Sequence, residues 1–426
     1  MSADTIFALS SGRPPAAVSI IRVSGPGAHG AGRKLAGSLP DARTAALRTL
    51  RDEAGGRLDD ALVLRFDGPA SSTGEDIVEF QCHGGRAVVD AVLGALAEIG
   101  GLRPANPGEF TRRAFENGRI DLTEAEGLAD LIEAETEFQR KSALAMAEGG
   151  LRRQIEQWQK RVLILSAQAE AAIDYAEDDD VGTHLTLAKD CSELARELGE
   201  WLGRPRVEPL KDGVRVVVAG PPNAGKSSLI NAIAGQERAI VTDIPGTTRD
   251  HIEVPLALGG IPILLTDTAG LRESDETIER IGIDRARSLV EGADVLLWLG
   301  EPREAPEHPR RILVHPRADL PERVPAPDGS VAVSSVTGAG LKELLARTSE
   351  LAASLLPGEG GIALNRRQAA HVAEAQEALE AAAATRDFVL AAEDVRAARV
   401  AFDRLTGRAG MEDVLDALFG RFCLGK

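Results

Sequence analysis

A glycine-rich segment in the middle of the chain, GPPNAGKSSL from Gly220 to Leu229, has the residue spacing of a phosphate-binding loop. It matches GxxxxGK[ST], in which backbone N–H groups of the loop and of the following helix N-terminus receive phosphate oxygens. Lys226 is expected to reach the β- and γ-phosphates, and Ser227 is expected to ligate Mg²⁺. A β-type run, VRVVVAG, precedes the motif and a helical segment, SLINAIAG, follows it, which is the context that the motif requires. The predicted contacts in this loop are Asn223, Ala224, Gly225, Lys226, Ser227 and Ser228.

Two further segments follow in the order expected of a nucleotide hydrolase with switch loops. IPILLTDTAG places Asp267 at the end of an apolar strand, where a carboxylate can hold Mg²⁺ through water. TDIPGTTRD lies between that segment and the phosphate loop, and its Thr248 is the candidate hydroxyl for Mg²⁺ and the γ-phosphate. The predicted contacts in the two segments are Thr242, Asp243, Ile244, Pro245, Gly246, Thr247, Thr248, Asp267, Thr268, Ala269 and Gly270.

The segment that should recognise the base departs from the usual guanine pattern. A GTPase normally shows NKxD, whose carboxylate pairs with the guanine edge. Here ILVHPRADL keeps Asp319 but has Pro316 and Arg317 in place of Asn and Lys. The later VAVSSVTGAG resembles the last guanine loop, and its candidate contacts are Ser334, Ser335 and Val336. Because the switch segments are of the GTPase type, GTP is favoured over ATP.

Hydrolysis needs a group that orients water and a cation that neutralises developing charge. Ras-like proteins place Gln after DTAG, whereas Leu271 stands here. One carboxylate of LRESDETIER could orient the water, although such a charge run is usually a solvated surface. Arg249 and Arg272 are candidate arginine fingers. The alternative is a metal ion held by Asn223 and by oxygens of Thr242 to Thr247.

The regions around these motifs indicate three kinds of structure. Residues 1–118 alternate short β-type runs with turn clusters, which is typical of an α+β domain. Helical periodicity fills 119–210 and returns over 358–426, on either side of the βα-repeating residues 211–357. We therefore predict a multidomain α/β protein in which a Ras-like P-loop domain is inserted into a discontinuous helical domain. Two separate helical domains are the alternative.

Composition limits the partners and the compartment. The net charge of −17 argues against an extended basic surface, so any RNA contact should be local or partner-assisted. The three cysteines, Cys82, Cys191 and Cys423, are widely spaced, which fits a reducing cytoplasm and gives no zinc signature. The sequence shows no signal peptide and no apolar run that approaches the roughly 18 residues of a membrane span. We expect a cytoplasmic protein that does not enter a membrane.

Over essentially its full length the sequence resembles the MnmE (TrmE) family of tRNA modification GTPases. The resemblance rests on DTIFALSSGR, VSIIRVSG, TGEDIVEFQCHGG, NPGEFTRRAFENGRIDLTEAEGLADLI, the nucleotide motifs and the closing FCLGK. It implies that residues 1–118 form a tetrahydrofolate-binding and dimerisation domain of a homodimer. It also implies a K⁺-dependent GTPase that works with the flavoprotein MnmG. Together they would add a (carboxymethyl)aminomethyl group at C5 of wobble uridine 34 of certain tRNAs, using 5-formyl- or 5,10-methylene-tetrahydrofolate.

For the N-terminal domain and the C-terminus, the resemblance implies folate contacts and one reactive group. The positions that match the family's folate contacts are Arg22, Glu79, Arg119 and Lys426. Arg119 is commonly lysine in the family, a change that preserves charge but not geometry. Cys423 matches a cysteine proposed to assist the modification chemistry, and an inert cysteine is the alternative.

For the P-loop domain, the resemblance implies that K⁺ takes the place of an arginine finger. The matching K⁺ positions are Asn223, Thr242, Ile244 and Thr247. Glu279 matches the family's water-orienting glutamate, which distinguishes it from its acidic neighbours.

Two other functions fit parts of the sequence. A ribosome-assembly GTPase like Era or Der shares the nucleotide motifs, but it carries a basic RNA-binding module in place of the folate-type N-terminus and FCLGK. A degenerate GTPase kept as a scaffold for MnmG would fit Pro316. The residues that argue against a scaffold are Lys226, Ser227, Thr248 and Asp267.

Overall fold

The computed structural model describes most of the chain, in two compact units. The described residues are 4–174, 181–236, 238–239, 253–268, 287–358, 360–408, 412–420, 422 and 425. One unit comprises residues 1–129 and 403–426, and the other comprises residues 130–402. None of the helices in the described residues combines the length and the hydropathy that a membrane span needs.

The first unit is built on a six-stranded sheet with the strand order β3-β4-β5-β2-β1-β6. Its strands are β1 (Thr5–Leu9), β2 (Val18–Ser24), β3 (Ala45–Arg51), β4 (Arg57–Phe66), β5 (Ile77–His83) and β6 (Leu102–Pro104). Neighbouring strands are antiparallel except β1 and β6, which are parallel. The helices are α1 (Ala28–Ala36), α2 (Arg86–Ala97), α3 (Glu109–Glu116) and α14 (Glu412–Phe419). This mixture confirms the predicted α+β fold.

The two faces of this sheet have different environments. Side chains alternate between the faces along each strand. The core that joins one face to α1 and α2 includes Ile21, Val23, Ala31, Leu35, Val78, Phe80, Val89 and Val92. Arg22 and Glu79 alternate with these core residues and therefore lie on the opposite face. A separate apolar cluster includes Ile6, Ala8, Ala105 and Phe110.

The second unit contains a seven-stranded sheet with the order β13-β12-β11-β7-β10-β9-β8. Its strands are β7 (Val214–Ala219), β8 (Arg238–Ala239), β9 (Glu253–Leu258), β10 (Ile261–Asp267), β11 (Val295–Trp298), β12 (Arg311–Pro316) and β13 (Val331–Val333). The five strands from β13 to β10 in this order are parallel, and β9 and β8 are added antiparallel. The described helical elements of this sheet domain are α8 (Glu208–Asp212), α9 (Lys226–Gln236), the 3-10 helix η1 (Pro302–Glu304) and α11 (Leu341–Ala353). The predicted P-loop α/β fold is confirmed.

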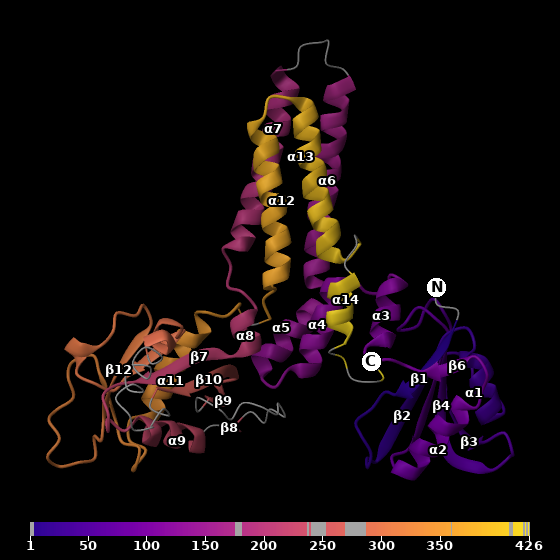
Figure 1. Ribbon diagram of the computed structural model, residues 1–426, viewed down its shortest axis with the longest axis horizontal. Helices are drawn as coiled ribbons and strands as arrows, with labels where there is room; N and C mark the ends of the chain where they lie inside the picture. The colour runs from indigo at the N-terminus through magenta and orange to yellow at the C-terminus, as the bar shows by residue number, and fades with distance from the viewer. Residues whose placement is uncertain are drawn as a thin grey trace, which may run out of the picture. The chain divides into compact units, whose positions relative to one another are not determined.

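The remaining long helices form a bundle in which α6, α7, α12 and α13 lie side by side (Figure 1). The described helices that belong to neither sheet domain are α4 (Leu122–Glu133), α5 (Glu137–Ala147), α6 (Gly150–Asp174), α7 (Val181–Leu202), α12 (Arg366–Ala384) and α13 (Phe388–Thr406). Trp158 of α6 is fully buried between Trp201 of α7 and Phe402 of α13, with ring centroids 5.4 and 5.8 Å away. Segments before and after the inserted sheet therefore share one core. This confirms the discontinuous helical domain, whereas the exact boundaries at 118, 210 and 357 stay predictions.

We expect Trp158→Ala to lower the free energy of unfolding of the bundle by about 3–5 kcal/mol, because a large buried side chain leaves a cavity. The substitution also removes the hydrogen bond that Trp158 Nε1 donates to Glu197 Oε1 at 2.8 Å. Chemical denaturation followed by far-ultraviolet circular dichroism measures the change. Leu163→Ala is the control on the same helix, because Leu163 is 59% exposed. Its effect should stay below about 0.5 kcal/mol, and equal losses in both variants would contradict the assigned core.

Candidate functional site

The phosphate loop connects the end of β7 to the start of α9, and its backbone explains its residue types. Gly220 and Gly225 have φ of 150° and 98°, which residues with a Cβ rarely adopt. A Cβ on Gly220 would also lie 3.1 Å from Leu299 Cβ. Asn223 has φ of 60°, a left-handed conformation that asparagine tolerates better than most residues. The motif therefore specifies a loop that other residue types would strain.

Lys226 is buried at the first turn of α9, with only 7% of its surface exposed. Its Nζ donates hydrogen bonds to the carbonyl oxygens of Gly220 at 2.8 Å and Pro221 at 3.0 Å. A buried ammonium group is stable only when acceptors surround it. The loop therefore holds a positive charge where the motif predicts that phosphates bind.

Ser227 and Asp267 are brought together by the parallel pairing of β7 and β10. Asp267 lies opposite Val218 in the strand register and is 2% exposed. Ser227 Oγ donates to Asp267 Oδ2 at 2.8 Å, and Thr268 Oγ1 donates to the Val218 carbonyl at 3.1 Å. A hydroxyl and a carboxylate are hard oxygen donors, which Mg²⁺ prefers. The pair therefore fits the predicted Mg²⁺ site.

Asp319 lies on the exposed turn that follows β12. The Ala318 N–H donates to the Val333 carbonyl at 3.1 Å, so this turn is tied to the end of the neighbouring strand β13. The carboxyl ends of parallel strands meet at one edge of a sheet. The candidate base turn and the phosphate loop therefore lie at the same edge.

The loop after β13 uses Ser334 as a structural residue. Ser334 is fully buried, and its Oγ accepts hydrogen bonds from the N–H groups of Val336 at 3.2 Å and Thr337 at 3.0 Å. Ser335 is half-buried, and Val336 is 87% exposed. The side chain of Ser334 therefore shapes the loop, while Ser335 and Val336 lie where a ligand could reach them.

Several predicted residues lie outside the described residues. In the switch segments these are Thr242, Asp243, Ile244, Pro245, Gly246, Thr247, Thr248, Ala269, Gly270 and Glu279. At the C-terminus they are Cys423 and Lys426. The roles assigned to these residues stay predictions.

The candidate folate residues Arg22 and Glu79 lie directly opposite each other on β2 and β5. Arg22 Nε donates to Glu79 Oε1 at 2.8 Å, and its guanidinium lies 5.6 Å from the centre of the Phe110 ring. Arg119 is exposed, and a Cβ on Gly74 would lie 3.3 Å from its Cγ. The structure thus pairs Arg22 with Glu79 and places Arg119 beside Gly74.

The C-terminal segment returns to the sheet that carries these residues. A Cβ on Gly425 would lie 2.0 Å from the Leu9 carbonyl oxygen, so the backbone of Gly425 packs against the end of β1. Gly425 has φ of 93°, which also favours glycine. Ala8, next to Leu9, lies opposite Arg22 in the register. Gly425 of the closing FCLGK therefore lies against the strand that neighbours Arg22.

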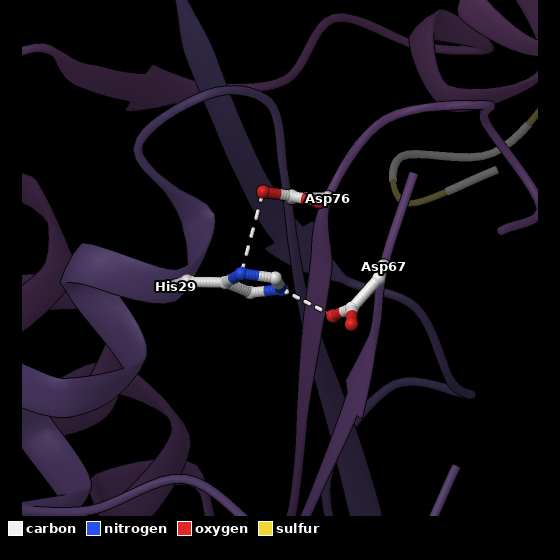
Figure 2. A group of neighbouring side chains, drawn as sticks. All are labelled: His29, Asp67 and Asp76. Carbon is white, nitrogen blue, oxygen red and sulfur yellow. Dashed lines mark ion pairs between the residues drawn. The ribbon is translucent and has the colours of Figure 1, made fainter. Parts of the chain in front are cut away.

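Figure 2 shows His29 of α1 between Asp67 and Asp76, the two ends of the connection from β4 to β5. Its Nε2 lies 3.4 Å from Asp67 Oδ1, and its Nδ1 lies 3.3 Å from Asp76 Oδ2. These three residues could offer metal ligands within 4.8 Å of one another. However, each ring nitrogen faces a different carboxylate, and Arg65 holds both oxygens of Asp67 at 2.7 and 2.9 Å. The hydrogen bond from Arg65 also lowers the pKa of Asp67. The geometry fits an imidazole that bridges the two carboxylates and ties this connection to α1 better than it fits a metal centre.

Sequence reasoning missed contacts that join distant segments. The ring of His29 with its two carboxylates gives no motif, because the three residues come from separate elements. Arg317 departs from NKxD in the sequence, yet its guanidinium donates to the Asn223 carbonyl at 2.6 Å. The spacing of the phosphate-loop motif does not predict the contact between Arg317 and Asn223.

Two family models match this chain. The model described as GTP-binding protein TrmE N-terminus covers residues 5–119, and the MnmE helical domain covers residues 122–423. The chain is 55% identical over 425 residues to the tRNA modification GTPase MnmE of Erythrobacter litoralis, covering 99% of this chain and 100% of the relative. The protein of the same description from Novosphingobium aromaticivorans is 52% identical, with 99% of this chain and 100% of the relative covered. The protein of the same description from Rhizorhabdus wittichii is 54% identical, with 100% of this chain and 97% of the relative covered.

Cys82 and Cys191 are buried free thiols. Burial, together with the negative charge of Asp59, raises the pKa of Cys82 to about 12. Burial, together with Asp190, raises the pKa of Cys191 to about 12 as well. Because the thiolate is the reactive form, neither residue is suited to act as a nucleophile.

We expect iodoacetamide at about pH 8 to leave Cys82 and Cys191 unmodified in the folded protein, because a raised pKa keeps both thiols protonated there. Unfolding exposes the same thiols and returns their pKa towards the ordinary value of about 8.5, so both should then react. Peptide mass spectrometry of the native and the denatured samples measures the difference. Equal labelling of either cysteine in the two samples would contradict its assigned burial.

Proposed function

This chain belongs to the MnmE family of tRNA modification GTPases, and we infer that it hydrolyses GTP in the course of tRNA modification. The observation that carries the inference is the buried Lys226 beside the Ser227–Asp267 pair at the carboxyl edge of a parallel sheet. The finer proposal is that the protein is K⁺-dependent and works with MnmG in the cytoplasm. Together they add a (carboxymethyl)aminomethyl group at C5 of uridine 34, using a one-carbon tetrahydrofolate.

The phosphate site assigns separate tasks to three residues. Lys226 exchanges its bonds to the loop carbonyls for bonds to the β- and γ-phosphates, so its charge is already at the site when the nucleotide binds. Ser227 directly and Asp267 through a bound water would hold Mg²⁺, which when bound neutralises charge on the phosphates. Fixed charges of this kind stabilise the transition state because they need little reorganisation.

Base recognition is assigned to Asp319 on the turn after β12. A carboxylate accepts hydrogen bonds from the N–H groups of the guanine edge, which adenine does not offer in that arrangement. The exposed Ser335 and Val336 would border the base from the neighbouring loop. Guanine selection then rests on Asp319 without the asparagine of NKxD.

Water activation and charge neutralisation are assigned to the switch segments and the phosphate loop. Glu279 orients the attacking water, which Leu271 cannot do because its side chain has no polar group. The proposed K⁺ ligands are Asn223, Thr242, Ile244 and Thr247. When bound there, K⁺ supplies the positive charge that an arginine finger supplies in other GTPases. Thr248 and Gly270 complete the γ-phosphate contacts.

The first unit is proposed to bind a tetrahydrofolate. Its pterin ring carries N–H and amino donors, and Glu79 is a partly buried carboxylate that can accept them. Arg22 holds Glu79 in place, and Phe110 offers an aromatic surface beside it. Arg119, Cys423 and Lys426 are proposed to complete the site, with Cys423 assisting the modification chemistry. Tetrahydrofolate when bound supplies a one-carbon unit.

Exposed apolar residues on the same sheet support a homodimer formed through this unit. Leu47 and Leu62 lie opposite each other on β3 and β4 and are 65% and 43% exposed. Leu62 lies between the buried Ala61 and Val63, so it faces away from the core with α1 and α2. Val18 is a further exposed apolar residue of the sheet, at 52%. Exposed apolar surface of this kind typically marks an interface.

The two alternative functions are less well supported. A ribosome-assembly factor like Era or Der does not explain the match to TrmE N-terminus over residues 5–119. An inactive scaffold for MnmG does not explain why Lys226 is kept buried and paired with carbonyl groups. The net charge of −17 fits tRNA contact that MnmG assists.

We expect GTP turnover in KCl to exceed turnover in NaCl of equal ionic strength by at least about tenfold, because K⁺ would neutralise transition-state charge. ATP turnover should stay low in both salts. Lys226→Ala should abolish the K⁺-stimulated rate, whereas Lys342→Ala, at an exposed position of α11, should keep it. Phosphate release measures these rates. Equally slow GTP turnover in both salts would contradict the K⁺ mechanism and favour the inactive scaffold for MnmG.

Leu62→Glu is expected to convert the dimer to a monomer, because a charge buried in an apolar interface loses its hydration. Light scattering after gel filtration gives the molar mass. Leu163→Glu, at a position of α6 that is 59% exposed, serves as the matched control and should remain dimeric. If Leu62→Glu keeps the mass of the wild type, the dimer does not use this face.

A further inference from the structure

The turn that carries Arg119 follows α3 and is fixed by a side-chain amide. Asn117 caps the end of α3, and Gly118 has φ of 68°, a left-handed conformation that lets the chain leave the helix. The Arg119 N–H donates to the Ala114 carbonyl at 2.8 Å, which closes the turn. Asn117 Nδ2 donates to the Thr73 carbonyl at 2.8 Å, across 44 positions of the sequence. This amide therefore joins the turn to the connection between β4 and β5.

Thr73 is in turn joined to the sheet by its hydroxyl group. Thr73 is 1% exposed, and Ser24, the last residue of β2, is fully buried. Their hydroxyl oxygens lie 2.7 Å apart, and Ser24 Oγ donates to Glu75 Oε2 at 2.8 Å. Because a serine hydroxyl has only one hydrogen, Thr73 Oγ1 must be the donor to Ser24 Oγ. Ser24, Thr73 and Asn117 thus form one continuous chain of hydrogen bonds.

This chain of hydrogen bonds ends close to both candidate folate arginines. Ser24 is two positions after Arg22 on β2, so the two side chains lie on the same face of the sheet. At the other end, Asn117 is two positions before Arg119. Gly74 packs against the turn, because a Cβ there would lie 2.8 Å from Asn117 Cβ and 3.3 Å from Arg119 Cγ. The chain therefore connects the strand of Arg22 to the turn of Arg119.

Buried charges hold the carboxylate that anchors this chain. Arg113 of α3 is 2% exposed, and its Nη1 lies 3.2 Å from both side-chain oxygens of Glu75. Its Nη2 donates to Asp4 Oδ1 at 2.9 Å and to Glu109 Oε1 at 3.1 Å. Separating charges that are buried together is costly, because one of them is left without compensation. Glu75, which accepts from Ser24, is therefore a fixed point for the chain.

We propose that Thr73 and Asn117 are positioning residues that hold the Arg119 turn against the strand of Arg22, so that the tetrahydrofolate site is formed before its ligand arrives. The inference rests on the proposed binding of tetrahydrofolate to this unit. Arg119 is exposed, so the backbone of its turn sets where the guanidinium can reach. A turn that is not held would have to be ordered on binding, which lowers the affinity.

Calorimetric titration of 5-formyl-tetrahydrofolate into the full-length protein tests the proposal. Asn117→Ala removes the donor to the Thr73 carbonyl without adding a charge, and it should weaken binding by about fivefold or more. Thr73→Val removes the hydroxyl and should weaken binding similarly, whereas Thr73→Ser keeps the hydroxyl and should stay within about twofold of the wild type. Ser72→Ala, at an exposed position of the same connection, is the matched control and should also stay within about twofold.

A double-mutant cycle with Arg119 distinguishes positioning from a general structural defect. If Asn117 acts through the turn of Arg119, its side chain matters only while the arginine is present. Asn117→Ala should therefore weaken binding by less than about twofold when it is added to Arg119→Ala. A structural defect elsewhere in the unit would instead lower the affinity by the same factor in both backgrounds.

Unchanged affinity in both Asn117→Ala and Thr73→Val would overturn the proposal. Full additivity of Asn117→Ala with Arg119→Ala, or an equal loss in Ser72→Ala, would overturn it as well, because the effect would then not depend on the turn. If the wild type itself does not bind 5-formyl-tetrahydrofolate, the proposed tetrahydrofolate site is rejected together with its positioning. A wild type that binds, with variants that bind equally well, rejects the positioning alone.

Discussion

The parallel pairing of β7 with β10 and β11 is the constraint on which the nucleotide site depends. Parallel strands end at one edge of the sheet, so loops from distant parts of the sequence converge there. The register that places Asp267 opposite Val218 leaves its carboxylate 2.8 Å from Ser227 Oγ. Apolar side chains bury these strands on both faces of the sheet and hold the strand register. They thereby also fix the distance between the Asp267 carboxylate and the Ser227 hydroxyl. Lys226 tolerates burial there only because the loop supplies carbonyl acceptors.

The first unit uses strand register in the same way, but with an antiparallel sheet. The alternation that buries Val23 and Phe80 against α1 and α2 leaves Arg22 and Glu79 on the other face, directly opposite each other. Exposed leucines of β3 and β4 belong to that sheet as well. One face of the sheet is thus covered by α1 and α2. The second face carries the Arg22–Glu79 pair, the exposed leucines, and Ile6 and Ala8 packed with Phe110 of α3.

Much of the fold and part of the site could be predicted from the sequence because they depend on local spacing. The phosphate loop, its lysine and the order of the motifs are local features, and helical periodicity on both sides of the insertion predicted the shared bundle. The contact of Arg317 with Asn223 was not predicted, because it depends on a left-handed turn and joins residues 94 positions apart. Alternation could assign Arg22 and Glu79 to one face, but the register between β2 and β5 follows from no short pattern. The buried role of Ser334 likewise depends on loop hydrogen bonds that spacing does not determine.

Displacement of fluorescent GDP by unlabelled GTP and ATP in the presence of Mg²⁺ tests most directly whether this sheet edge is a guanine nucleotide site. Because Asp319 would pair with donors that adenine lacks, GTP should displace the probe at a concentration at least about a hundredfold lower than ATP. Asp319→Ala should bring the two concentrations closer together. Displacement by ATP and GTP at equal concentrations would contradict the assignment, and it would mean that Pro316 and Arg317 mark a site that does not select guanine.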